Sequence, residues 1–344
     1  MKIAYLLDTF PSPTETFIAR EIESLRRRGF SIEIFAFNAG KGATLIAQPL
    51  RAKLSLRRWE LVGGALDLSG FAHVHAGWAN SLADVARAAA RKNGISWSFS
   101  AHARDLWVEG GDLKSKLASA HFASSCTRAG FEYLRGFGDN VIYAPHGLEI
   151  ARYPFRLWRS SGGIRVVGVG RLVEKKGWLD LIAGLELLPP DRSLALQVIG
   201  DGPLKPELER ALQADGFRGV GTLRGALPHE EVVKTMSRWA NCLVLPSRRT
   251  REGDRDGLAN VLLEAAALGL PIVTTNAGSA SDLVDDSTGL LVDAGDVPAF
   301  VSALQRVFDE PEATIARCHN ARKRVEDEFD VDKNIAVLAS AFGS

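Results

Sequence analysis

The sequence predicts an α/β protein built from two similar halves, each a parallel sheet covered by helices on both faces. Strand-like apolar runs alternate with helical segments along the chain, which is the pattern of parallel sheets with crossover helices. The alternation is interrupted by a turn-rich stretch at residues 151–163 and then restarts. A length of 344 residues also suits two domains, each large enough to bury its own core.

The first half alternates from its beginning. In order, we expect strand 3–7, helix 14–28, strand 31–37, strand 73–75, helix 81–91 and strand 96–100. Residues 38–70 are interrupted by Gly40, Gly42, Gly63 and Gly64 and have weak periodicity, so only a short helix and mobile loops are expected there.

The second half repeats the alternation. In order, we expect strand 165–169, helix 178–188, strand 194–199, helix 204–214, strand 220–223, helix 230–239, strand 242–245, helix 260–268, strand 272–275 and strand 289–292. From Val297 onward only helices are expected, including a charged one at 317–328 and an apolar one at 334–342. We therefore set domains at residues 1–155 and 156–330, with residues 331–344 as a helix that crosses back to the first domain.

Composition excludes several classes of protein. A net charge of +1 gives no general attraction to nucleic acid, and no apolar run is long enough to cross a bilayer. The three cysteines, Cys126, Cys242 and Cys318, are widely spaced and odd in number, which argues against a disulfide framework and favours the cytoplasm. The amino terminus runs directly into a strand, so no export signal is expected.

Positive charge is concentrated near the amino terminus. Between Arg20 and Glu60 there are nine Lys or Arg residues against four acids, an excess of five. Such an excess most often belongs to a solvated helix face. It also fits a basic surface that contacts either an anionic acceptor or the anionic lipid at the cytoplasmic face of a membrane.

Two cations follow the strand predicted at 165–169. Arg171 and Lys176 lie where this strand leads into a helix, and together they could flank a diphosphate, with Arg making paired hydrogen bonds and Lys acting as a point charge. The alternative is a pair of exposed surface cations. The nearby glycines do not complete a dinucleotide fingerprint, so a nicotinamide dehydrogenase is the least favoured class.

Two acids eight positions apart bracket a short loop and the start of an apolar helix. Asp256 could face a sugar and Glu264 a ribose, whereas the alternative is a capping acid followed by a helix-face acid. Residues 248–255 precede this pair and are too charged to be core, so we expect a mobile loop at a cleft. The small residues at 276–282 fit either an anion-binding helix start or an ordinary turn.

The histidines of the first half have weaker signals. His102 follows a predicted buried strand, with Asp105 one helical turn later, and could be structural or catalytic. His73 and His75 share one face of a strand, but no acid or cysteine stands nearby at ligand spacing, so no metal site is expected.

Together, these motifs resemble the retaining glycosyltransferases of family four, which have the two-domain GT-B fold. The resemblance runs from about Val166 to Val292 through ordered motifs: Gly170-Arg171-Leu172 with Lys176-Gly177, Ile199 to Leu204, Leu223-Arg224-Gly225, Leu245-Pro246-Ser247, Asp256 to Glu264 and Gly289 to Val292. In the first half, Phe10 to Ile18 and Phe99 to Asp105 resemble the branch that builds bacterial exopolysaccharides such as colanic acid.

The resemblance implies a fold and a set of site residues. Two Rossmann-like domains would face each other across a cleft, with C-terminal helices packing back toward the first domain. Arg171 and Lys176 would hold the donor diphosphate without a metal, Asp256 would lie close to the donor sugar, and Glu264 would bind the ribose. Arg224 and Leu227 would lie beside the base, and His102 would approach the sugar. The sugar and β-phosphate would be reached by the backbone amides of Gly257, Leu258, Ala259, Asn260 and Val261. The acceptor side would include Thr14, Glu15, Thr16 and Asp105.

The implied activity is retaining transfer of a hexose-type sugar. The donor would be a UDP- or GDP-sugar, and the acceptor a glycan or lipid-linked glycan in exopolysaccharide biosynthesis. Asp256 departs from the glutamate usual in the family and is one methylene shorter. Ser281 and Asp282 stand where the family commonly has Pro-Glu. Two alternatives remain open: a non-catalytic GT-B partner of another transferase, and a GT-B sugar-nucleotide epimerase.

Overall fold

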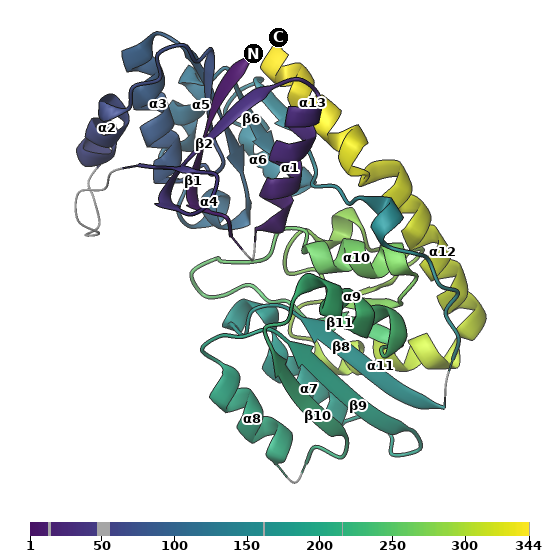
Figure 1. Ribbon diagram of the computed structural model, residues 1–344. Helices are drawn as coiled ribbons and strands as arrows, with labels where there is room; N and C mark the ends of the chain where they lie inside the picture. Colours follow the sequence, from purple (N-terminus) through teal and green to yellow (C-terminus); the bar gives the residue numbers. More distant parts are fainter. Residues whose placement is uncertain (13–14, 47–55, 161, 215, 344) are drawn as a thin grey trace. The chain divides into compact units, whose positions relative to one another are not determined.

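The computed structural model describes residues 1–12, 15–46, 56–160, 162–214 and 216–343, and its contacts divide the chain into two compact units. Unit 1 contains Met1–Gly147 and Val331–Ser344, and unit 2 contains Leu148–Asp330. Figure 1 shows the elements of each unit. The predicted domain border was at residue 156, but Leu148 already belongs to unit 2. Its backbone N–H donates to the carbonyl oxygen of Phe329 at 2.8 Å, so the chain joins unit 2 before the turn-rich stretch.

Unit 1 is built on a parallel sheet. The described strands lie in the order β3-β2-β1-β4-β5-β6-β7, and every pairing between them is parallel. Their bounds are β1 Lys2–Phe10, β2 Ser31–Ala39, β3 Thr44–Leu45, β4 His73–Ala76, β5 Ser96–Ala101, β6 Phe122–Ser125 and β7 Val141–Tyr143. The strands β3, β6 and β7 were not predicted, because runs of two to four residues carry little periodic signal.

Helices cover both faces of this sheet. Their bounds are α1 Thr16–Arg27, α2 Leu56–Ala65, α3 Ser81–Asn93, α4 Ala103–Trp107, α5 Leu113–Ser119, α6 Arg128–Arg135 and α13 Val331–Gly343. The central strand β1 shows the two faces: Tyr5 packs in a cluster with α1 and α13, whereas Leu6 packs in the cluster that contains α3. Side chains of a strand alternate between faces, which explains this division. Figure 1 shows α13 alongside α1, as expected for the C-terminal helix.

The predicted face shared by His73 and His75 is buried and fully hydrogen-bonded. The serines of β5 alternate with the two rings, so that the Ser98 hydroxyl lies 2.7 Å from His73 Nε2 and 2.7 Å from His75 Nδ1. The other ring nitrogens contact Ser96 and Ser100. A neutral imidazole has one donor and one acceptor nitrogen, so a chain of hydroxyls can satisfy both rings. These histidines therefore have a structural role.

This network predicts a loss of stability in acid. Burial, with a smaller contribution from His121, lowers the pKa of His73 to about 3, against about 6.5 in an unfolded chain. Between these values the unfolded state binds more protons, so the free energy of unfolding falls as pH decreases below 6.5. For His73 alone, the loss at pH 5 is about 2 kcal/mol.

Urea unfolding at pH 7.5 and pH 5 measures this effect. The wild-type protein is expected to lose more stability between the two conditions than a His73→Asn variant, and an exposed control, His319→Asn, is expected to behave as wild type. An equal pH dependence in the wild type and the His73 variant would contradict the assignment.

Unit 2 repeats the architecture with a second parallel sheet. The described strands lie in the order β10-β9-β8-β11-β12-β13. Their bounds are β8 Gly163–Val169, β9 Ser193–Ile199, β10 Val220–Gly225, β11 Cys242–Leu245, β12 Ile272–Thr275 and β13 Leu290–Val292. The α-helices are α7 Trp178–Glu186, α8 Lys205–Gln213, α9 His229–Arg238, α10 Asn260–Leu268, α11 Val297–Asp309 and α12 Pro311–Glu328. The sequence predicted these six strands and helices α7 to α10, and only their ends differ. For the region of α11 it predicted helix without bounds, and α12 begins six residues before the predicted 317.

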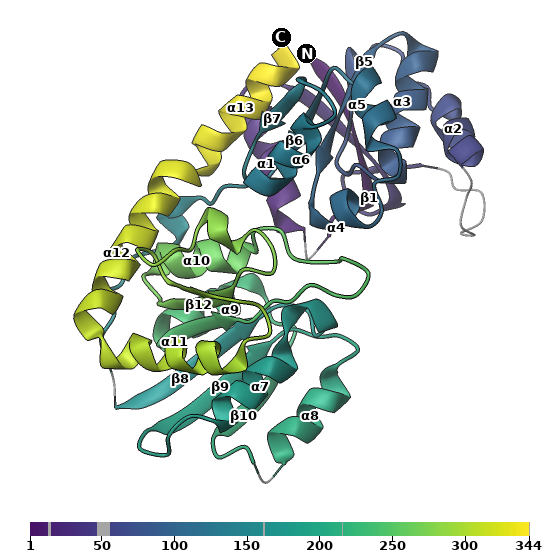
Figure 2. The same ribbon diagram turned by 180° about the vertical axis from the view of Figure 1, so that it is seen from behind.

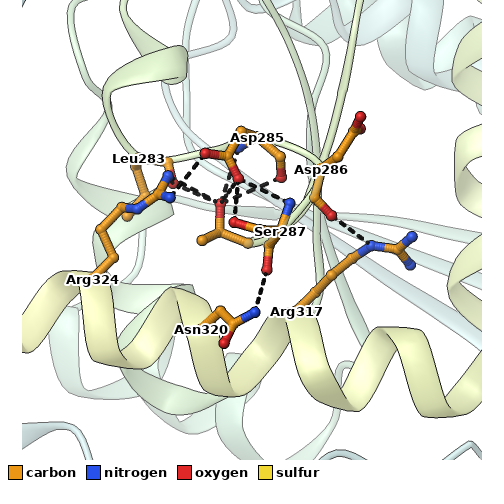
Figure 3. Close-up of polar contacts among 8 residues, drawn as sticks. Leu283, Asp285, Asp286, Ser287, Arg317, Asn320 and Arg324 are labelled. Atoms are coloured by element: carbon orange, nitrogen blue, oxygen red, sulfur yellow. Dashed lines mark hydrogen bonds and ion pairs between the residues drawn. The ribbon is translucent and has the colours of Figure 1, made fainter.

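The longest helix of unit 2, α12, is held by a polar cluster (Figure 3). Arg324 makes an ion pair with Asp285 at 2.8 Å and donates to the carbonyl oxygen of Leu283 at 2.9 Å. Asn320 donates to the carbonyl oxygen of Ser287 at 3.0 Å. Figure 2 shows α12 following α11, on which it packs. Charged residues of α12 therefore face the loop before β13. This contact explains why the sequence of the helix has a charged rather than an amphipathic pattern.

Candidate functional site

Loops at the carboxyl ends of the unit 2 strands approach one another closely. A Cβ atom on Gly177, which follows β8, would lie 1.8 Å from the carbonyl oxygen of Pro246, which follows β11. A Cβ atom on Gly278, after β12, would lie 2.0 Å from the carbonyl oxygen of Asp256. Only glycine fits at these contacts. The glycines thus bring three strand ends together at the edge where ligands of parallel α/β sheets bind.

Lys176 and Asp256 meet at this edge. Lys176 Nζ lies 2.8 Å from Asp256 Oδ2, and the Ser247 hydroxyl donates to the same oxygen at 2.6 Å. Burial by itself would raise the pKa of Asp256, but Lys176 and Ser247 outweigh it and hold the carboxyl below its usual value. The buried Lys175 pairs with Asp254 at 3.0 Å. The predicted sugar-facing acid is therefore an ionised partner of the predicted phosphate-binding lysine.

Arg171 is differently placed. It is exposed directly after β8, and within the described parts of the chain its side chain has no ion pair. Its backbone carbonyl accepts a hydrogen bond from the Trp178 indole at 2.8 Å, which fixes the loop but leaves the guanidinium in solvent. Lys176 is thus held by an acid, whereas the Arg171 guanidinium is open to an incoming anion.

Helix α10, which carries Glu264 and begins four positions after Asp256, starts without a side-chain cap. Ala259 is the N-cap of α10, and its side chain makes no capping hydrogen bond. The first amides of a helix have no partner within the helix, and the helix dipole favours a negative charge beside them. The backbone from Gly257 to Val261 can therefore donate to a bound anion.

Glu264 lies in a separate polar group on the same helix. Its side chain is 8% exposed, and its Oε1 accepts hydrogen bonds from His229 Nε2 at 3.0 Å and from the Tyr153 hydroxyl at 3.4 Å. A carboxylate can only accept, so His229 carries its proton on Nε2. Sequence reasoning missed Tyr153 and His229, since they stand 111 and 35 positions from Glu264 and share no motif with it.

The two residues predicted beside the base lie on β10 and the loop that follows it. Arg224 is exposed and donates to the Gln197 side chain at 2.8 Å. Leu227 is half-buried against the core of unit 2 and precedes His229 by two positions. Leu227 thus belongs to the loop that brings His229 to Glu264, whereas Arg224 points to the neighbouring strand β9.

In unit 1, Asp105 positions the loop that carries His102. Its Oδ1 accepts a hydrogen bond from the His102 backbone N–H at 2.8 Å, and its Oδ2 accepts from the Ala79 N–H at 2.6 Å. Burial raises the pKa of Asp105 to about 7 and outweighs these hydrogen bonds. Asp105 was predicted on the acceptor side, but its carboxyl group is buried and ties two strand ends together.

The His102 imidazole lies in an aromatic environment. Its ring centre is 4.2 Å from that of Trp78 and 5.5 Å from that of Phe17. Burial lowers the pKa of His102 to about 3, so the ring is neutral. Among the other predicted acceptor residues, Glu15 is the N-cap of α1, Thr16 is exposed at its start, and Thr14 lies outside the described residues.

Sequence reasoning missed two neighbours of His102. One ligand-type atom from each of His102, Cys126 and His146 lies within 4.8 Å of the other two. The three residues follow β5, β6 and β7, which are adjacent in the sheet. The signal that could have found them is their common position after consecutive strands, because the carboxyl ends of parallel strands meet at one edge.

Comparison with known proteins shows what the second half of the chain resembles. Residues 163–310 match the model of the family described as Glycosyl transferases group 1. This part of the chain is therefore similar to that family, in agreement with the motifs of the second half. The fold is similar to that of Anabaena Alr3699/HepE, which was solved in complex with UDP and glucose. The two structures align over 100% of this chain and 99% of the HepE chain, with a TM-score of 0.77 and 16% sequence identity. The predicted GT-B fold class is thus confirmed.

Two curated relatives indicate the range of activities in the family. One is a GDP-mannose-dependent alpha-(1-6)-phosphatidylinositol monomannoside mannosyltransferase from Mycobacterium tuberculosis, 28% identical over 75% of this chain and 70% of the relative. The other is the putative colanic acid biosynthesis glycosyltransferase WcaL from Escherichia coli K12, 28% identical over 59% of this chain and 52% of the relative. The chain spans less than half the length of several further relatives, 48% of one and 44% of another.

A search of the described helices finds none with the length and apolar character that a membrane span requires.

Proposed function

We propose that this protein is a retaining glycosyltransferase that moves a hexose-type sugar from a UDP- or GDP-sugar to a glycan or lipid-linked glycan. The observation that carries the proposal is the arrangement in unit 2 of Lys176, Asp256 and the uncapped start of α10 at one sheet edge. The similarity of residues 163–310 to the family supports it.

The chemistry of this edge suits departure of a nucleoside diphosphate. Breaking the bond between sugar and phosphate leaves negative charge on the β-phosphate and positive charge on the anomeric carbon. Arg171, Lys176 and the amides of Gly257 to Val261 supply preorganised positive charge and donors for the phosphate, which lowers the barrier without a bound metal. The carboxylate of Asp256 can hold Lys176 in place and accept from a sugar hydroxyl.

Calorimetry with UDP, GDP, ADP and NADH tests the donor assignment directly, first with EDTA and then with magnesium. We expect tight binding of one nucleoside diphosphate in the presence of EDTA. Binding of none, or of NADH alone, would contradict the proposal. Turnover of the matching nucleotide sugar is then measured with and without an acceptor. A transferase needs the acceptor, an epimerase turns over without it, and a non-catalytic partner shows no turnover.

Glu264 is expected to recognise the ribose. We propose that its buried carboxylate, held by His229 and Tyr153, accepts hydrogen bonds from both ribose hydroxyls. In a Glu264→Gln variant, affinity for the nucleoside diphosphate should fall about tenfold or more, because hydrogen bonds to a charged group contribute about 1.5 to 3 kcal/mol. The variant should also lose the preference for the ribonucleotide over its 2′,3′-dideoxy analogue.

An exposed acid on α8, Glu209, provides the matched control as Glu209→Gln. Calorimetry of both nucleotides with the three proteins measures the effect. A Glu264 variant that still discriminates between the two nucleotides would place the ribose elsewhere.

Contact with an anionic membrane is supported by helix α2. Leu56 and Leu61 are 53% and 73% exposed, and Arg57 and Arg58 are exposed beside them. Apolar and basic side chains on one exposed helix suit the interface of an anionic bilayer. Flotation with phosphatidylglycerol vesicles should recover the wild-type protein and lose most of a Leu61→Asp variant. Equal recovery of both would contradict this contact. The remaining basic residues of the 20–60 segment include Arg51 and Lys53, which lie outside the described residues.

A further inference from the structure

Buried polar atoms that lack partners are concentrated in one part of unit 1. In the described parts of the chain, six buried side-chain nitrogen or oxygen atoms have no hydrogen-bond partner. Four of them belong to three residues: Nε and Nη2 of Arg20, Nδ1 of His102 and Nε2 of His146. A buried donor without a partner is costly, so such atoms are rare and need a specific explanation. The unpartnered atoms of Arg20, His102 and His146 lie in one part of unit 1 and not at scattered positions.

Helix α1 and the end of β7 bring these residues together. The Phe17 ring on α1 packs on the His146 ring with 4.0 Å between centres and on the His102 ring at 5.5 Å. Arg20 lies three positions after Phe17 and therefore on the same face of the helix. Burial, then His102 and then the charge of Arg20 lower the pKa of His146. The His102 and His146 rings are stacked 5.3 Å apart.

The chemistry of the group fits an oxygen-rich anion. The Nε and Nη2 atoms form the edge of a guanidinium that makes two parallel hydrogen bonds to a carboxylate or a phosphate. The two neutral imidazoles can each donate to, or accept from, a further hydroxyl or oxygen. A metal ion held by His102, Cys126 and His146 is the competing explanation, but the neighbouring guanidinium repels a cation. An anion can accept from both unpartnered nitrogens of Arg20, whereas a cation leaves them unsatisfied.

We infer that Arg20, His102 and His146 bind an oxoanion, a carboxylate or phosphate group of the acceptor, so that the acceptor is acidic. This inference deepens the proposed function and rests on it only in naming the acceptor. Arg20 supplies the charge, and the histidines select an anion with hydroxyl groups beside it. The excess of basic residues in this part of the sequence is consistent with an acidic acceptor.

Binding of small probes tests this site without knowledge of the acceptor. Glucuronate and glycerol 1-phosphate carry the two oxoanions, and glucose is the uncharged counterpart of glucuronate. NMR titration of the full-length protein should show that at least one of the two anions binds and that glucose binds at least tenfold more weakly. Which anion binds distinguishes a uronic acid from a phosphate. An Arg20→Gln variant should lose the anion at least tenfold, and Arg20→Lys should keep part of the affinity.

The controls separate this site from general charge and from the donor site. Arg91→Gln removes an exposed arginine of unit 1 and should bind the anion as wild type. Equal affinity for glucuronate and glucose, failure of both anions to bind wild-type protein, or unchanged binding by Arg20→Gln would each overturn the inference. Zinc binding that is lost in Cys126→Ser, with no anion binding, would assign the cluster to a metal instead. UDP and GDP titrations of the same samples show whether the donor proposal fails separately.

Discussion

Replacing Lys176 by alanine is expected to reduce turnover about 100- to 1000-fold, the usual cost of losing one preorganised group that stabilises charge in a transition state. The lysine is half-buried and lies 2.8 Å from Asp256, at the sheet edge where the diphosphate is proposed to leave. Its loss removes positive charge from the phosphate and leaves the Asp256 carboxylate with Ser247 and the more distant Lys175 at 3.9 Å. Affinity for the nucleoside diphosphate should fall as well.

Steady-state kinetics with the nucleotide sugar selected by calorimetry measure this effect. Lys234→Ala, which removes an exposed lysine of unit 2, is the matched control and should leave turnover unchanged. A Lys176→Ala variant with wild-type turnover and wild-type nucleotide affinity would show that the phosphate binds elsewhere. Thermal melting of both variants checks that any loss does not come from unfolding.

Replacing Lys116 by methionine is expected to lower the free energy of unfolding by about 3 to 5 kcal/mol, the cost of breaking a buried ion pair by removing one partner. Lys116 lies on α5 and is 3% exposed. Its Nζ donates to the carbonyl oxygens of Ala79, Asn80 and Gly110 at 2.8 to 2.9 Å and pairs with Asp84 at 3.2 Å. Methionine fills a similar volume but leaves a carboxylate and three carbonyl groups without this donor.

The same helix offers a matched control. Lys114 is exposed two positions before Lys116, so Lys114→Met makes the same chemical change in solvent. Urea unfolding should show a large loss for Lys116→Met and a change within about 0.5 kcal/mol for Lys114→Met. Equal stability of the two variants would mean that the carbonyl groups around Lys116 find other partners, such as water.

The residues of the proposed donor site were predicted from the sequence, but the contacts between them were not. The motifs identified Lys176, Asp256 and Glu264, since each lies in a short segment with recognisable order. They did not show that Lys176 and Asp256 pair with each other, or that His229 and Tyr153 hold Glu264. The unpredicted contacts join residues far apart in sequence, so their geometry depends on which strands are neighbours.

The sequence by itself determined the alternation of strands and helices in unit 2, part of that in unit 1, and the resemblance to a family. Side-chain periodicity, glycines and short motifs are local, and they specify an element without its neighbours. Only the tertiary structure decided the order of the strands in each sheet, and with it which loops meet at their carboxyl ends. That order places His102, Cys126 and His146 together after β5, β6 and β7, with Arg20 contributed by α1. Burial then leaves the Arg20, His102 and His146 nitrogens without partners, because folding removes water from them without supplying another acceptor or donor.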